Sequence, residues 1–444
     1  MNTDFANLAA LPRELGDGLV LRRSTPADAD RLAEFNIRIH SEDEPDQRIG
    51  VWTRDLLTGN HPTFGANDFL IVERSADAKI ISSSNLISQT WTYNGIPFGV
   101  GRPELVGTDP EYRRRGLVRL QMDVLHAWSQ ARGELVQAIT GIPNYYRQFG
   151  YEMTVDLDGG WFLHYAQYKP LAEGEHEDYV IRPAADGDVP VLMQAYAHVE
   201  QRQALSCART AKDWLYELTG KDQKNIDHVE LFVIEETSGQ PVGAVGVKCA
   251  MWQDGLPVQF YGLLPGYSYL MVTPGVLRFL WRLGQEWVGE GKTCTRLVFL
   301  LGGQHPARVA FHPRMISPLN PYAYYMRVAD LPGFLRLITP VLEQRLAQSP
   351  CAGHSGELRL NFFRGGLMMK LEKGRLNEIG KFAPRDGEDG EAFFPGLSFL
   401  QLLFQSRSLY ELRDFYADCS AKVEAQALLD AMFPCNPSTV WPIS

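Results

Sequence analysis

The chain has 444 residues, of which 45% are hydrophobic and 22% charged, and its formal net charge is −10. This length exceeds what one hydrophobic core usually supports, so two or three domains are expected, and the negative charge disfavours nucleic acid as a partner. The six cysteines include no Cys-x-x-Cys pair, which argues against both a disulfide framework and a zinc site.

The first residues predict a cytoplasmic protein without a membrane partner. Residues 1–5 contain no basic segment, and no apolar segment follows that could serve as a secretion signal. No apolar run approaches the length of a membrane span.

The first predicted elements are a strand at residues 19–22 and a helix that opens at residues 26–32 with acidic capping residues. The helix continues to His40 and runs into the acidic residues 41–46. This acidic segment is a solvated loop in the simpler interpretation, and a holder for a polycation in the alternative. Three aromatic residues are interpreted as core residues, with pocket walls as the alternative: Trp52, Trp91 and Phe98.

Residues 104–119 are the most informative segment of the chain. They predict a strand, a turn at Pro110, a loop with three arginines and a glycine, and the start of a helix. The helix face is formed by Leu117, Leu120, Val124, Leu125 and Trp128. A helix N-terminus presents unpaired N–H groups, and Gly116 allows close backbone approach, so this segment suits a pyrophosphate group. The alternative interpretations are a solvated basic loop and, more weakly, a nucleic-acid contact.

This order of elements resembles the acyl-CoA-binding motif of the GNAT N-acetyltransferase superfamily, Arg/Gln-x-x-Gly-x-Gly/Ala. Arg113 and Gly116 match the motif, whereas Val118 stands where a small residue is usual. The branch typified by the enhanced intracellular survival acetyltransferases tolerates this departure. The resemblance implies acetyl-CoA as co-substrate, without a metal, held by Val106, Gly107, Thr108, Arg113, Arg114, Arg115, Gly116, Leu117 and Val118.

A candidate general acid follows a predicted strand at residues 135–139. The family pattern Tyr-x-x-Phe-Gly-Tyr matches the segment that begins at Tyr146. The resemblance implies that this strand splays from its neighbour to admit the thioester, and that Tyr146 protonates the departing CoA thiolate. Tyr145 is adjacent, and the alternative is that both tyrosines are packing residues.

Two groups remain open as the base that takes the proton of the amine. Glu104 stands on the cofactor strand, where many GNAT enzymes carry a glutamate. The enhanced-survival branch uses a C-terminal carboxylate instead, which here would be that of Ser444. The backbone N–H of Val106 or Thr108 is the expected donor to the oxyanion.

A repeat of the first elements predicts a second domain of the same type. Arg182 and Asp188 each stand 160 positions after Arg22 and Asp28. Strands are expected at residues 230–235 and 241–247. The counterpart of the cofactor loop begins at Leu270 and lacks the arginines, so this domain is expected to have lost cofactor binding and to serve structure or substrate shaping.

The last region, from about residue 320, resembles the sterol-carrier-like C-terminal domain of the same branch. A helix is expected at residues 331–338 and strands at 357–363 and 367–372. Residues 381–391 are expected as a loop, followed by helices at 398–412 and 421–433.

The predicted fold class is therefore α/β (α+β), with tandem GNAT-like domains of mixed, splayed sheets plus the C-terminal domain. The expected divisions are residues 1–165, 175–315 and 320–444. The resemblance implies an enzyme that acetylates a primary amine on an aminoglycoside, a polyamine, or a lysine or peptide substrate. The alternative is a non-catalytic protein that senses CoA or carries an apolar ligand. The family likeness also implies a homo-oligomer, a trimer or a hexamer.

Overall fold

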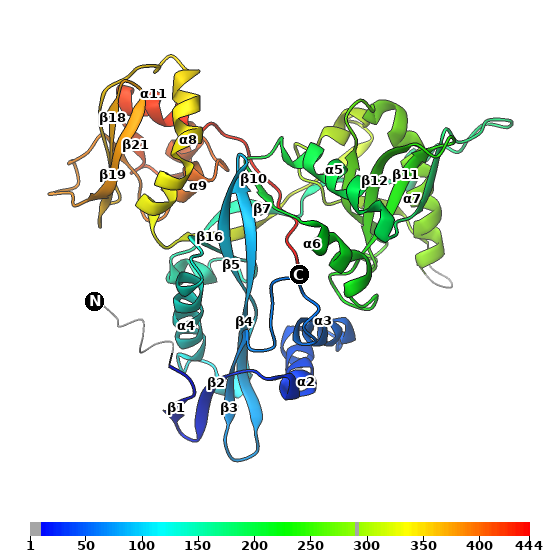
Figure 1. Ribbon diagram of the computed structural model, residues 1–444, viewed down its shortest axis with the longest axis horizontal. Coiled ribbons are helices and arrows are strands. Elements are labelled where there is room, and N and C mark those ends of the chain that lie inside the picture. Colours follow the sequence, from blue (N-terminus) through cyan, green and yellow to red (C-terminus); the bar gives the residue numbers. More distant parts are fainter. Residues whose placement is uncertain (1–9, 289–292) are drawn as a thin grey trace.

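The computed structural model describes residues 10–288 and 293–444, and these residues form three β-sheets with helices on their faces (Figure 1). The first sheet has the strand order β1-β2-β3-β4-β5-β6-β16-β7, and β10 pairs with β4 at its side. Its strands are β1 Arg13–Gly16, β2 Leu19–Arg23, β3 Phe69–Arg74, β4 Lys79–Tyr93, β5 Ile96–Thr108, β6 Val136–Ile139, β7 Glu152–Leu157, β10 Leu205–Cys207 and β16 Tyr322–Val328. The mixed α/β fold class is confirmed.

Helices cover both faces of the first sheet. Helix α4 (Leu117–Ala131) packs on one face, where Leu117, Val124, Leu125 and Trp128 are buried against the strands. Helices α2 (Ala29–His40) and α3 (Gln47–Leu57) pack on the other face and bury a second apolar cluster. The apolar spacing predicted α4 and its buried face correctly. Apolar residues repeat with a period of 3.6 residues when one face of a helix packs against a core.

The second sheet has the order β15-β8-β14-β13-β12-β11-β9. Its strands are β8 Gly160–His164, β9 Tyr179–Pro183, β11 Val229–Glu236, β12 Pro241–Lys248, β13 Gly255–Leu263, β14 Arg296–Phe299 and β15 Ile316–Leu319. The accompanying helices are α5 Val189–Glu200, α6 Ala211–Leu215 and α7 Tyr269–Trp287. Helix α7 begins ahead of the segment expected as its start, so Pro274 lies inside the helix rather than before it.

The two sheets exchange one strand each. β8 follows β7 in the chain, yet it pairs with β14 and β15 in the second sheet. β16 follows β15 in the chain, yet it lies between β6 and β7 in the first sheet. The borders of the sheets therefore cross the expected divisions of the chain near residues 165 and 320, while the division into three domains stays a prediction.

The third sheet has the order β19-β18-β17-β20-β21. Its strands are β17 Gly356–Asn361, β18 Gly366–Glu372, β19 Arg375–Phe382, β20 Ala392–Phe393 and β21 Ser420–Ala421. The helices of this region are α8 Leu331–Ala347, α9 Phe399–Leu403, α10 Leu409–Phe415 and α11 Val423–Met432. One apolar cluster runs from the end of the first sheet into this region, so the two share a core.

The single helix expected at residues 398–412 is wrong, because the chain turns between α9 and α10. Gln405 has a left-handed φ of 61°, which a helix does not accommodate. Ser408 then caps α10, since its hydroxyl accepts the Glu411 N–H at 3.2 Å. The apolar residues on either side follow a helical period, so their spacing alone did not reveal the break.

Candidate functional site

The loop before α4 forms one wall of a cleft of about 740 Å³, here called the α4 cleft. Gly116 caps α4 with a left-handed φ of 77°, and Arg114 before it also has a positive φ, of 62°. This backbone directs the N-terminus of a fifteen-residue helix at the cleft. Arg113 and Arg114 line the cleft, and within the described residues neither makes an ion pair. The loop therefore offers uncompensated positive charge and backbone N–H groups to an anion.

The opposite wall of the α4 cleft is the end of β5, which is bulged. Cross-strand register places Ser83 opposite Gly107 but Asn85 opposite Glu104, so Leu105 and Val106 fall between paired positions. Leu105 has a φ of 48°, unusual for a bulky residue, which is how the extra residue is accommodated. The bulge frees backbone groups of β5 from regular pairing at the point where the strand borders the cleft.

Strands β5 and β6 splay beyond a short parallel pairing. Only Val100 and Gly101 of β5 pair with β6, although β5 continues to Thr108. Residues 106–108 therefore lie beside an open gap, in the manner of an unpaired sheet edge that can receive an extended ligand.

Tyr146 lies across the gap, in the short 3₁₀ turn Tyr145–Phe149 that follows β6. It is 5% exposed, and burial first, then the nearby charge of Glu104, raises its pKa, so the phenol stays protonated. A Cβ atom on Gly141 would lie 3.1 Å from Cε2 and 3.5 Å from Oη of this tyrosine. Gly141 also has a φ of 131°, so space and backbone both require glycine here.

The exchanged strand β16 holds the loop that carries Tyr146. The hydroxyl of Tyr322 donates to the carbonyl of Gly141. The hydroxyl of Tyr325 accepts the Asn144 N–H at 2.5 Å, and its ring lies 5.7 Å from that of Tyr146 in an edge arrangement. A strand from a distant part of the sequence thus sets the position of the tyrosine.

A second cavity, of about 330 Å³, adjoins the α4 cleft and is called here the junction cavity. Four residues line both spaces: His40, Val106, Ile142 and Tyr146. Glu104 lines the junction cavity opposite Tyr146. Burial raises the pKa of Glu104, and the positive charge of Arg102, its ion-pair partner, opposes that shift.

A third cavity, of about 340 Å³, continues from the junction cavity and is called here the tail cavity. The two share Trp52, Glu104, Thr140 and Ile226. The tail cavity is also lined by four residues of the second region, Lys221, Asp227, Lys248 and Gln259, and by the last residues of the chain, including Ser444. Through their shared lining residues, the three spaces adjoin one another in a row from the basic loop, past Tyr146 and Glu104, to residue 444.

Hydrogen bonds fix the last residues of the chain in this position. Arg102 Nη1 donates to the Ile443 carbonyl at 3.0 Å, and the Gln89 amide donates to the same carbonyl. Arg209 donates to the Pro442 carbonyl at 2.8 Å and stacks over Trp441 at 3.9 Å. Gln89 and Arg102 lie in β4 and β5 of the first sheet, and Arg209 lies just before α6, so the tail connects the first sheet to the helices of the second region.

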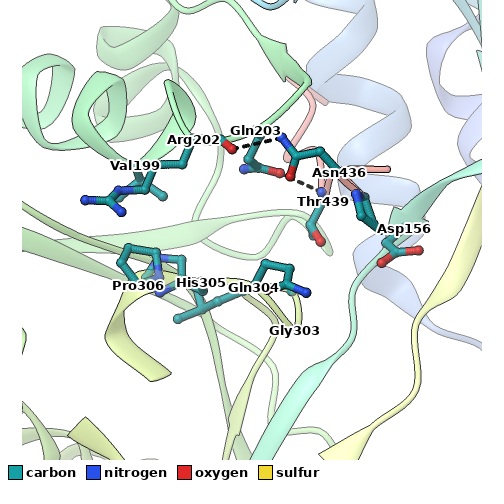
Figure 2. A pocket seen from close by; sticks show the side chains of 13 residues that line it. Asp156, Val199, Arg202, Gln203, Gly303, Gln304, His305, Pro306, Asn436 and Thr439 are labelled. Atoms are coloured by element: carbon teal, nitrogen blue, oxygen red, sulfur yellow. Dashed lines mark hydrogen bonds between the residues drawn. The ribbon is translucent and has the colours of Figure 1, made fainter. Parts of the chain in front are cut away.

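Further back, the tail is tied to the end of α5. Figure 2 shows the side chain of Asn436 donating to the Arg202 carbonyl, at 3.2 Å, and that of Gln203 accepting the Thr439 N–H, at 2.6 Å. The residues drawn line a smaller cavity of about 140 Å³ between the second sheet and β7. These contacts set the path along which the tail reaches the tail cavity.

The comparisons with known proteins address the first region directly. Residues 21–154 match the family model described as an acetyltransferase (GNAT) domain. Residues 21–154 form a GNAT acetyltransferase domain. The matched residues include the cofactor motif, Glu104 and Tyr146, so the resemblance expected from the sequence is confirmed for this domain.

Solved structures resemble nearly the whole chain. A probable N-acyltransferase from Enterococcus faecalis superposes with a TM-score of 0.67 at 14% identity, covering 95% of this chain and 98% of the other. A GCN5-related N-acetyltransferase from Kribbella flavida gives a TM-score of 0.60 at 16% identity, with coverage of 95% and 97%. Eis1 from Mycobacterium abscessus gives 0.58 at 14% identity, with coverage of 94% and 98%. No curated protein sequence matches the chain. At these identities the likeness concerns the fold of the full chain.

The structure gathers most of the predicted site residues around the GNAT domain's cavities. The α4 cleft is lined by Val106, Gly107, Thr108, Arg113, Arg114, Gly116, Leu117, Val118 and Tyr146. Arg115 is turned away and pairs with Asp17. Glu104 and Ser444 lie in the adjoining cavities, Ser444 only in the tail cavity.

The three aromatic residues and the acidic segment, which had pocket roles as alternatives, do not all line the cavities. Trp52 lines the junction and tail cavities, whereas Trp91 and Phe98 are core residues. In the acidic segment, Asp46 caps α3 and pairs with Arg48 at 2.6 Å. The sequence interpretation did not single out Arg102, although the two-residue period of a strand places it on the same face as Glu104.

Two further findings bear on cofactors and membranes. Across residues 10–288 and 293–444, no group of His, Cys, Asp and Glu side chains is arranged to hold a metal ion. No helix of the described chain is both long and apolar enough to cross a membrane.

Proposed function

We propose that the protein transfers an acetyl group from acetyl-CoA to a primary amine by direct attack of the amine on the thioester. The observation that carries this proposal is the path of three adjoining cavities, with Tyr146 and Glu104 both lining the middle one. A two-substrate transfer needs such a path, because donor and acceptor must meet with their reactive atoms in contact.

The α4 cleft suits the CoA portion. Arg113, Arg114 and the N-terminus of α4 supply charge and N–H groups for the pyrophosphate. Backbone groups of residues 106–108 suit the pantetheine amides in the manner of an added strand. The N–H of Val106 or Thr108 is the donor proposed for the oxyanion, since both residues border the splayed gap.

The two titratable groups of the junction cavity take opposite roles. Tyr146 is the proposed acid, because burial keeps its phenol protonated until a thiolate forms beside it. Glu104 is the proposed base, because it faces both the junction and the tail cavities. Ser444 borders only the tail cavity, so its carboxylate suits binding of the acceptor more than direct proton removal.

The tail cavity suits an ammonium-bearing acceptor. Its cations are already paired: Arg102 with Glu104, Lys221 with Glu217 at 3.0 Å, and Lys248 with Asp227 at 3.7 Å. Gln259 Oε1 is buried and has no hydrogen-bond partner among the described residues, and the Asp158 side chain lines the same cavity. These groups accept hydrogen bonds and favour an amine, whether of an aminoglycoside, a polyamine or a lysine peptide. In this proposal the second region shapes the acceptor site, and the third is a sterol-carrier-like domain of a cytoplasmic homo-oligomer.

The test is thiol release from acetyl-CoA against aminoglycosides, polyamines, arylamines and lysine peptides. Turnover with one amine class that Tyr146→Phe loses and Tyr145→Phe keeps supports the proposal and identifies the acceptor. Tight CoA binding without turnover on any amine contradicts it and favours a CoA sensor or a carrier of an apolar ligand.

A further inference from the structure

Arg102 is a buried cation between Glu104 and the last residues of the chain, and the proposed proton transfers do not use it. It stands two residues before Glu104 on β5, so both side chains project from the same face of the strand. The side chain of Arg102 is 3% exposed and that of Glu104 is 11% exposed. Both residues line the tail cavity. The two charges are therefore paired away from bulk solvent, beside the space proposed for the acceptor.

The guanidinium of Arg102 bonds two different partners through its two terminal nitrogens. Arg102 Nη2 donates to Glu104 Oε1, and Nη1 donates to the Ile443 carbonyl at 3.0 Å. Gln89 donates to the same carbonyl, and its own Oε1 accepts the Trp91 indole N–H at 2.9 Å. A planar guanidinium bonded on both sides is held in one orientation. The cation is therefore fixed against the Glu104 carboxylate.

This pairing controls whether Glu104 is charged. Burial raises the pKa of Glu104, and the positive charge of Arg102 opposes that rise. Asp227, which also lines the tail cavity, raises the pKa of Glu104 further through its own negative charge. A buried carboxyl group without a cation takes up a proton instead of remaining charged. A protonated carboxyl cannot receive the proton of an amine, so the proposed base depends on the cation beside it.

The other titratable groups that face Glu104 do not replace Arg102. In the junction cavity, burial lowers the pKa of His40 and raises that of Tyr146, so both are uncharged. The titratable groups of the tail cavity are Asp158, Lys221, Asp227, Lys248, Tyr324 and the carboxylate of Ser444. The two lysines among them lie 3.0 Å and 3.7 Å from carboxylate oxygens of other residues. Within residues 10–288 and 293–444, Arg102 is the only cation that pairs with Glu104.

We propose that Arg102 is a positioning residue that keeps the Glu104 carboxylate ionised and fixed between the junction and tail cavities, an inference that rests on the proposed acetyl transfer. Arg102 exchanges no proton and acts through Glu104. The C–N bond forms, the C–S bond breaks, one amine proton passes to Glu104, and the thiolate takes the proton of Tyr146.

The test is the pH dependence of kcat/KM for one amine in the wild-type protein, Arg102→Lys and Arg102→Met. Because the base must be ionised, activity should rise with pH through the pKa of Glu104. Arg102→Met should move this rise to higher pH by about 1 to 3 units, since a neighbouring cation lowers the pKa of a carboxyl by that amount. Arg102→Lys keeps a charge and should recover most of the shift. An unmoved profile in Arg102→Met, or equal shifts in the two variants, would overturn the inference.

Gln89→Met is the matched control. It removes the other donor to the Ile443 carbonyl and leaves the pair of Arg102 and Glu104 in place. Its pH profile should coincide with that of the wild-type protein. A shift as large as that of Arg102→Met would mean that loosening of the tail, rather than loss of the cation, is responsible, and the inference would fail. Should Arg102→Met not fold, Arg102→Gln replaces it and the same outcomes decide.

A titration without turnover separates this inference from the proposed function. The ¹³C resonance of the Glu104 carboxyl, assigned by its loss in Glu104→Gln, should titrate at higher pH in Arg102→Met than in the wild-type protein. A shifted titration without turnover of any amine in the wild-type protein means that the proposed function alone fails. Turnover with an unshifted titration means that the role of Arg102 alone fails.

Discussion

The first and second sheets begin with the same ion-pair network and differ where a strand meets the following helix. In each, an arginine at the end of an opening strand bonds the aspartate that caps the next helix and a glutamate of the neighbouring strand. The partners are Asp28 and Glu73 for Arg22, and Asp188 and Glu235 for Arg182. Both sheets also carry a bulge, at Leu105 and Val106 in β5 and at Gln259 in β13.

The difference lies in what occupies the backbone at the end of the bulged strand. In the second sheet, the Leu263 N–H is bonded by Tyr269 Oη at 3.3 Å, and its carbonyl by His198 Nδ1 at 2.7 Å. In the first sheet, the end of β5 borders the α4 cleft. The same scaffold therefore differs at this point: side chains bond the end of the strand in the second sheet, whereas in the first sheet the end of β5 borders a cavity.

The largest expected effect concerns chemistry that only the first sheet carries. Tyr146→Phe should lower kcat about 10²- to 10⁴-fold, since a general acid contributes on that order, while the Kd for CoA remains unchanged. Thiol release under saturating substrates measures it. Tyr145→Phe, in the same turn, is the matched control, and an equal loss in both variants would mean that the turn rather than the phenol matters.

The next effect tests whether cofactor binding separates the two sheets. Isothermal titration should find one CoA per chain, and Arg113→Ala combined with Arg114→Ala should weaken it by about 10- to 100-fold, because charged hydrogen bonds are lost. Arg278→Ala in α7, which breaks an ion pair with Glu177, is the control and should leave the Kd unchanged. A stoichiometry of two CoA molecules per chain would mean that the second sheet also binds CoA, which contradicts the expected difference between the sheets.

Removing the capping aspartate of either ion-pair network should reduce stability in both sheets, by less than the effects above. Asp28→Ala should lower the free energy of unfolding by about 3 kcal/mol and Asp188→Ala by about 1 to 2 kcal/mol. The order follows from burial, since the side chain of Asp28 is 2% exposed and that of Asp188 14%. Denaturant unfolding measures both changes. A larger loss for Asp188→Ala than for Asp28→Ala would show that burial of the aspartate does not determine the size of the effect.

The smallest effect concerns Glu200, which ends α5 as His40 ends α2. Burial raises the pKa of Glu200 from 4.5 to about 8. The folded state therefore holds more protons than the unfolded state between these values, and stability falls as the pH rises through this window. Glu200→Gln should remove that loss, so its advantage in unfolding midpoint should be larger at about pH 8 than at about pH 5. Equal advantages at both pH values would contradict the shift.

The local part of this site was predictable from the sequence, and the non-local part was not. The loop before α4 and the turn at Tyr146 are continuous segments whose spacing carries their geometry, so both could be located. Tyr322 and Tyr325 were missed because residues 322–328 were assigned to the third region and no strand was expected there.

The same distinction applies to the fold. Helix α4 followed from its periodicity, and β11 and β12 followed from apolar runs close to their observed bounds. The exchange of β8 and β16 could not be predicted from the sequence, because strand order depends on pairing energies between distant segments. Residues 381–391 were expected as a loop, but β19 extends to Phe382 and the segment includes the ion pairs of Asp389 with Arg359 and Arg385.

The exchange of β8 and β16 also affects how the protein is made. During synthesis, the ribosome releases β7 long before β16, so the nascent first sheet waits with the edges of β6 and β7 unpaired. An unpaired edge is a template for pairing with other chains, and such intermediates attract chaperones. The loop that carries Tyr146 gains its tyrosine supports only when translation has passed residue 325. On the proposed mechanism, the site around Tyr146 is therefore completed late in translation, although the proposed cofactor motif is among the first parts to be made.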